Sequence, residues 1–159
     1  TEQGSGWVIS ALQSMDYTWE KSYLRRDVRE VVKEKPSFYF QRQCHMGSSL
    51  FSRGEAIARH EIGIDKIQIG MDYPHHEGTW GAGPGTLDWL RSTLGAAGAS
   101  PEDARKMLSE NAAKLWGFDL DKLRPVADEI GLKMDALLTP NDYDFFPRGD
   151  VHKPLATAF

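Results

Sequence analysis

Apolar and polar residues alternate over residues 64–70, which read Ile-Asp-Lys-Ile-Gln-Ile-Gly. This alternation predicts a β-strand, because successive strand side chains face opposite sides of a sheet. Residues 53–62 predict a short helix with Ile57 on its apolar side, ended by Gly63. Residues 38–46 predict a strand, or a short helical turn followed by a strand. A strand, a helix and a strand in this order imply a parallel pair.

Helical spacing of apolar residues dominates the rest of the chain. The best-marked helix begins at Ser100, which caps the free amides, with Pro101 in the first turn. Gly117 ends it. After Gly131 we expect a tail with little regular structure. The expected helices of this part span residues 7–19, 27–32, 86–94, 100–117 and 120–130.

Candidate chemistry gathers directly after the strand at residues 64–70. The next segment, Met-Asp-Tyr-Pro-His-His-Glu-Gly-Thr-Trp, places Asp72 at the strand end and His75 three residues later. In parallel α/β folds, side chains at this position converge on a substrate or a metal. A carboxylate and imidazoles are typical ligands of a zinc-like ion.

Two motifs, GMDYPHHEGTW and EDARKMLSENAAKLWGFDLDKL, resemble the C-terminal part of the amidohydrolase-related family. This family includes aminocarboxymuconate-semialdehyde decarboxylase and gamma-resorcylate decarboxylase. The segments EQGSGWV and PSFYFQRQC are similar to late segments of the same family, so the resemblance covers residues 1–138. It implies an α/β fold, the last three β/α units of a (β/α)8 TIM barrel, with strands ending near Glu2, near Met46 and at Asp72. The barrel portion would occupy residues 1–118. A C-terminal helix and an irregular tail would occupy residues 119–159.

The resemblance also implies an activity. We expect a metal-dependent enzyme that hydrolyses, or decarboxylates without oxidation, a small aromatic or unsaturated carboxylic acid, ester or amide. The implied cofactor is a divalent metal, zinc first and manganese second, with Asp72 as a ligand and acid/base. Family decarboxylases carry a histidine after the sixth strand, where this chain has Glu2. That difference argues against decarboxylase activity, unless Glu2 takes the role of the histidine. The implied assembly is a homodimer.

Six residues are candidates for the site. We interpret Asp72 as a metal-site carboxylate; the alternative is a carboxylate that only forms a turn. We interpret His75 as a catalytic group; the alternative is a histidine at the rim that bonds backbone. Glu2 is the third catalytic candidate. The candidate substrate contacts are Trp80, Trp7 and Arg42, the last through a bidentate bond to a carboxylate.

Composition narrows the function classes. The chain has 159 residues, 40% hydrophobic and 26% charged, as in ordinary globular proteins. Its net charge is −4, without the basic stripe expected of a nucleic-acid binder. No apolar run reaches the roughly 18 residues that span a bilayer. Cys44 is the single cysteine, so an internal disulfide is impossible, which suits a reducing compartment and a cytoplasmic location.

A different class of function stays open. The chain opens with Thr1-Glu2-Gln3-Gly4, which resembles the end of a strand, so we expect the C-terminal part of a longer protein. One carboxylate and one or two histidines are too few for a catalytic metal site. The chain would then be a non-catalytic fragment, inactive alone, that depends on a missing N-terminal barrel half or self-associates through exposed sheet edges.

Overall fold

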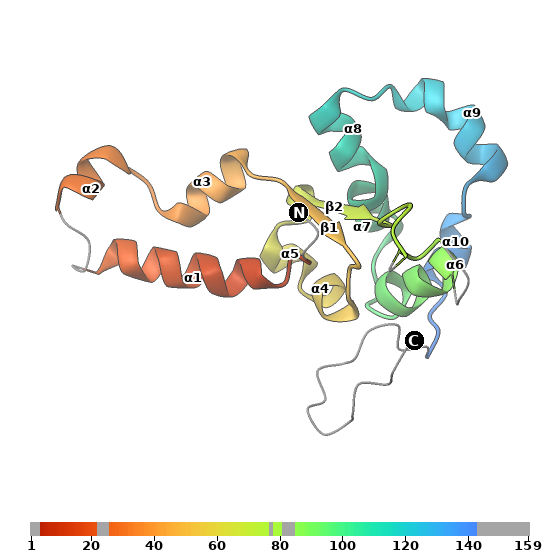
Figure 1. Cartoon of the computed structure of the whole chain (residues 1–159), viewed down its shortest axis with the longest axis horizontal. Helices are drawn as coiled ribbons and strands as arrows, with labels where there is room; N and C mark the ends of the chain where they lie inside the picture. Colours follow the sequence, from red (N-terminus) through yellow and green to blue (C-terminus); the bar gives the residue numbers. More distant parts are fainter. Residues whose placement is uncertain (1–3, 22–25, 77, 81–84, 143–159) are drawn as a thin grey trace.

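A single strand–helix–strand unit lies at the centre of the computed structural model (Figure 1). The two strands pair in parallel, with Met46 opposite Ile67 and Ser49 opposite Gly70. The predicted parallel pair is therefore confirmed. The structure describes residues 4–21, 26–76, 78–80 and 85–142. The unit consists of β1 (Met46–Ser49), α4 (Arg53–Ile57), α5 (Arg59–Ile62), η1 (Ile64–Lys66) and β2 (Ile67–Gly70).

The predicted barrel portion is wrong. Helices account for 63% of the structure, and the described residues contain one small open sheet of two strands. Of the two alternatives for residues 38–46, the strand is wrong and the helical turn followed by a strand is closer, because α3 (Pro36–Gln43) covers most of them and β1 begins at Met46. Pro36 favours the helix, because its fixed φ suits the first turn and its missing amide costs nothing there. Periodicity alone does not separate a strand from a helix in so short an apolar run.

Three helices form an arm that extends from the body of the molecule (Figure 1). Within it, α1 and α3 lie side by side. The Asp16 carboxylate of α1 accepts hydrogen bonds from the Ser37 amide, at 2.9 Å, and from the Ser37 hydroxyl. Asp16 therefore satisfies a free amide at the start of α3. The arm consists of α1 (Trp7–Glu20), α2 (Arg26–Val31) and α3.

The buried Glu55 carboxylate joins this arm to the central unit. One of its oxygens accepts hydrogen bonds from the amide and hydroxyl of Ser5 and from the Gly6 amide at 3.1 Å. The other accepts from the Ser52 amide at 2.8 Å and the Ser52 hydroxyl at 2.7 Å. Ser52 and Glu55 form a capping box at the start of α4. The same side chain therefore supports the beginnings of α1 and α4.

The C-terminal half is helical, as predicted. One continuous helical segment runs from the Ser100 cap, whose hydroxyl accepts from the Asp103 amide at 3.0 Å, to Gly117 at φ 74°. A short helix, α10, lies where an irregular tail was expected. Residues 143–159 of that tail lie outside the described residues. The segments are α6 (Gly85–Leu90), η2 (Arg91–Gly95), α7 (Pro101–Arg105), η3 (Lys106–Glu110), α8 (Asn111–Trp116), α9 (Leu120–Ile130) and α10 (Met134–Leu138).

The core packs these helices against the sheet. The buried Trp89 donates its indole N–H to the Phe51 carbonyl at 3.0 Å. The Asn111 amide donates to the Ile64 and Ile67 carbonyls, each at 2.8 Å, and so fixes the start of β2. Among the described residues, the apolar side chains larger than alanine with 0% exposure are those of Val8, Phe51, Ile62, Ile67, Trp89 and Leu94.

No helix in the described ranges is long and apolar enough to cross a membrane.

Glu55→Gln tests the joint between arm and body. The glutamine side chain lacks the negative charge, and its NH₂ group would face a hydroxyl or backbone amide that is itself a donor. We therefore expect the free energy of unfolding to fall by about 3 kcal/mol. Urea denaturation measures this change. Glu61→Gln, at an exposed position of α5, is the matched control and should change stability by less than about 0.5 kcal/mol. Equal effects of the two substitutions would contradict the assigned role of Glu55.

Candidate functional site

The loop after β2 folds back on itself through backbone hydrogen bonds. Asp72 lies two residues past the end of β2 and has φ 59°, in the left-handed region that aspartate tolerates better than most residues. The His75 amide donates to the Asp72 carbonyl at 2.8 Å, and the Gly78 amide to the His75 carbonyl at 3.0 Å. The Thr79 amide closes the loop on the Met71 carbonyl at 3.2 Å.

Asp72 and His75 are in direct contact. The Asp72 Oδ2 lies 3.0 Å from the His75 Nδ1, with the two side chains 21% and 53% exposed. A carboxylate at Nδ1 holds the proton on that nitrogen and leaves a lone pair on Nε2. The structure gives Nε2 no hydrogen bond to any described residue. His75 is therefore oriented to exchange a proton at Nε2 or to bind a cation there.

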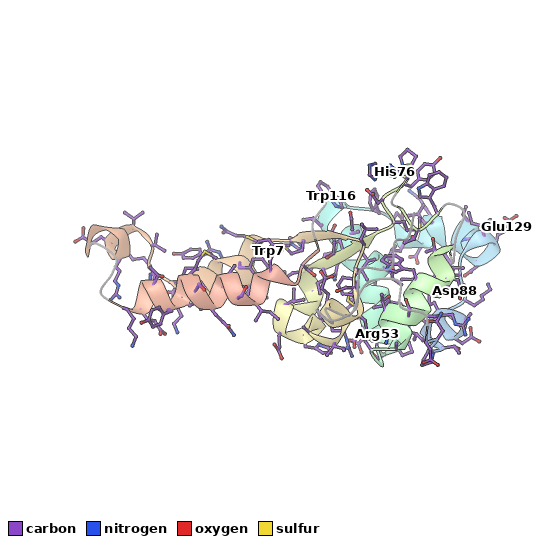
Figure 2. All side chains as sticks on the ribbon, turned by 60° about the horizontal axis from the view of Figure 1, so that its bottom comes forward. Trp7, Arg53, His76, Asp88, Trp116 and Glu129 are labelled. Carbon is purple, nitrogen blue, oxygen red and sulfur yellow. The ribbon has the colours of Figure 1, made fainter. Side chains whose placement is uncertain are left out.

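Aromatic rings lie on the His75 side of this pair. The Trp80 indole N–H donates to the His75 carbonyl at 2.9 Å, which places Trp80 beside one of the two predicted catalytic residues. The Tyr73 ring meets the Trp80 ring edge-on, with centroids 5.1 Å apart. The His76 ring lies 4.4 Å from that of His75, and Figure 2 shows His76 at the outer end of the loop. The loop thus gathers the partly exposed rings of Tyr73, His76 and Trp80 near His75.

The other candidate residues lie elsewhere. Trp7 begins α1 and is 50% exposed; Figure 2 shows it away from His76. The Arg42 guanidinium on α3 lies over the Tyr39 ring at 4.9 Å and donates to Gln43 Oε1 at 2.9 Å. Neither side chain has a hydrogen bond, ion pair or ring contact with the described part of the loop. Glu2 lies outside the described residues.

Two loop residues were missing from the sequence-based site. A Cβ at Gly78 would lie 2.6 Å from the Met71 carbonyl oxygen and 2.6 Å from Trp80 Cδ1, so only glycine fits there. Tyr73 was not among the six candidate residues, yet its ring packs against Trp80. At position 78 the glycine itself indicated a close backbone contact. Nothing in the sequence predicts the contact between Tyr73 and Trp80.

A metal site is incomplete among the described residues. They contain no group of three or more His, Cys, Asp or Glu side chains that could hold an ion. Asp72 and His75 form a pair, and Asp72 Oδ2 and His75 Nδ1 already contact each other. The predicted role of Asp72 as a ligand would therefore require further ligands from outside the described residues.

Asn111 holds the strand that leads into the site. In the structure it bonds the Ile64 and Ile67 carbonyls, at the start of β2 and not at the loop itself.

No family model, curated protein or solved structure matches the chain. The resemblance to the amidohydrolase-related family therefore stays a prediction from the two motifs.

Gly78→Ala tests the loop geometry. The added methyl group displaces the Met71 carbonyl or the Trp80 ring, so we expect the bond from Trp80 to His75 to break and stability to fall by about 1–3 kcal/mol. The Trp80 indole N–H resonance, identified by its loss in Trp80→Phe, should move in the NMR spectrum. Gly54→Ala is the control, because its Cβ would meet only Ser52 Oγ at 3.9 Å. An unchanged Trp80 resonance in Gly78→Ala would rule out the described packing.

Proposed function

We propose that this chain carries the acid–base pair of an enzyme that hydrolyses or decarboxylates a small carboxylic acid derivative. The observation that supports this proposal is the 3.0 Å contact between Asp72 Oδ2 and His75 Nδ1, beyond the carboxyl end of a parallel strand. Parallel strands commonly place reacting groups at this end. The pair has the carboxylate–imidazole form that general acid–base catalysis uses.

In hydrolysis, neutral His75 accepts a proton at Nε2 from a water molecule as the water oxygen attacks the substrate carbonyl. The Asp72 carboxylate stabilises the imidazolium that forms and keeps the ring oriented. The imidazolium then returns the proton to the leaving oxygen or nitrogen when the C–O or C–N bond breaks. The cycle thus ends with His75 neutral again.

In decarboxylation, His75 begins protonated. The C–C bond to the carboxylate breaks, carbon dioxide leaves, and the electron pair remains on the substrate carbon. The imidazolium then donates its proton to that carbon, and Asp72 again fixes the ring. Glu2 is the alternative proton donor in our proposal, because the resemblance aligns it with the catalytic histidine of the family's decarboxylases. The choice between the two reactions depends on the substrate.

The substrate we propose is small and contains an aromatic or unsaturated group. Trp80 supports this proposal, because its ring lies beside His75 and is 45% exposed. Offset or edge-on contact with such a ring favours planar substrates. Trp7 and Arg42 remain proposed contacts, with Arg42 offering a planar guanidinium to a carboxylate.

A divalent metal, zinc or manganese, remains part of the proposal with Asp72 as one ligand. When bound, such an ion polarises a carbonyl or carboxylate and lowers the pKa of a coordinated water molecule. Asp72 would offer Oδ1 to such an ion, because Oδ2 contacts His75 Nδ1. A homodimer and a small-molecule substrate complete the proposed partners.

A non-catalytic role for this chain alone is the second candidate. The observation that favours it is the lack, among the described residues, of a third side chain to complete a metal site. Under this alternative the chain binds a ligand or a partner and has no turnover by itself. Turnover by the 159-residue chain alone would exclude this second candidate.

His75→Ala tests the acid–base assignment. In the full-length protein carrying this sequence, we expect kcat/KM to fall by about 10²- to 10⁴-fold, because the proton acceptor is removed. The assays use nitrophenyl esters, anilides and hydroxybenzoates, with release of nitrophenol, aniline or carbon dioxide as the readout. His60→Ala is the control, because His60 is an exposed histidine on α5, and it should leave the rate within about twofold. Full activity in His75→Ala would refute the proposal.

Asp72→Ala tests the metal assignment separately. We expect about one zinc or manganese per full-length chain in elemental analysis and loss of most of it in the variant. Asp65→Ala, an exposed aspartate before β2, should keep the metal. Unchanged metal content in Asp72→Ala would exclude Asp72 as a ligand and leave the Asp72–His75 pair as a metal-independent site.

A further inference from the structure

The helix α9 exposes an apolar face that no described element covers. Leu123, Val126 and Ile130 are 50%, 54% and 77% exposed, and α9 has no buried residue. Their spacing of three and four residues places them on one side of the helix. Figure 1 shows α9 at the edge of the molecule, attached to the body through the segments at its two ends.

This helix is weak without a covering partner. It has 11 residues and an interior proline, Pro125. Isolated helices of this length are marginal in water, and the proline removes one backbone hydrogen bond. Helices of proteins gain most of their stability from the packing of an apolar face. Burying Leu123, Val126 and Ile130 would therefore stabilise α9 itself.

The charges along α9 complement those of a second α9 helix that runs in the opposite direction. Lys122 and Arg124 lie in the N-terminal half together with one acid, Asp121, whereas the C-terminal half holds only acids, Asp128 and Glu129. Lys122 precedes the first exposed apolar residue of the face, and Glu129 directly precedes Ile130, the last. The described partner of Lys122 is Asp119 at 3.4 Å, and both side chains are largely exposed, so this ion pair is weak.

An antiparallel pair of α9 helices brings these features together. With a two-fold axis near Val126, Leu123 of each copy meets Ile130 of the other, and Lys122 meets Glu129. The exposed Phe118, before the helix, then lies near Leu132, after the helix, of the second copy. Hydrophobic contacts in the centre and opposite charges at the flanks are the pattern of paired helices.

We propose that α9 is a dimerisation surface that binds a second copy of this chain in antiparallel orientation. The self-complementary charges favour a second copy over an unrelated apolar partner. In a two-fold contact, Lys122 of each copy lies against Glu129 of the other, so both ion pairs form at once. Val126 lies at the axis and faces Val126 of the other copy. The inference is independent of the proposed enzyme activity, since α9 carries none of the site residues.

Charge reversal tests the orientation. In sedimentation equilibrium, Lys122→Glu should raise the dimer dissociation constant by about tenfold, because it places two glutamates against each other twice per dimer. The double variant Lys122→Glu with Glu129→Lys should restore the dimer dissociation constant to within about threefold of the wild-type value. Lys33→Glu, the same charge change in the arm, is the control and should have no effect. A monomeric wild-type chain, or a double variant no better than the single one, would overturn the proposal.

A cysteine at the axis provides the second measurement. In a Cys44→Ser background, Val126→Cys should form a disulfide-linked dimer under mild oxidation, whereas Asp128→Cys, facing away from the contact, should not. Because α9 has no buried residue, these variants should keep the wild-type circular dichroism spectrum. Cross-linking at 128 and not at 126 would contradict the antiparallel pairing.

Discussion

The Glu55 carboxylate is the contact on which the arrangement of the molecule depends. It accepts hydrogen bonds from Ser5, Gly6 and Ser52, so two segments about 50 residues apart share one buried charge. Free amides at a helix start need an acceptor, and here the start of α1 finds it on α4. A buried carboxylate is tolerated only when such donors surround it. The position of the arm relative to the central unit follows from this requirement.

A second polar contact holds the strand that leads into the site. Asn111 bonds the Ile64 and Ile67 carbonyls and ties the C-terminal helices to β2. The loop beyond β2 is then closed by its own backbone bonds, which position Asp72 against His75. A proton-transfer group works only when its geometry is fixed. The candidate site therefore combines a supported strand with a self-closed loop.

The remaining surface suggests how the protein assembles. The site loop and α9 belong to different elements, so a ligand at His75 and a second chain at α9 would not compete for the same residues. Both surfaces expose apolar side chains, such as Trp80 and Ile130. Large exposed apolar groups on a folded protein often mark binding surfaces.

The sequence by itself determined the local features: the strand–helix–strand order, the Ser100 helix start, and Asp72 just beyond a strand. These depend on periodicity and capping over a few residues. Tertiary structure decided the rest. Residues 36–43 became a helix, and no barrel formed from the described residues. The Glu55 and Asn111 contacts join residues more than 40 positions apart, and no local pattern encodes such pairs.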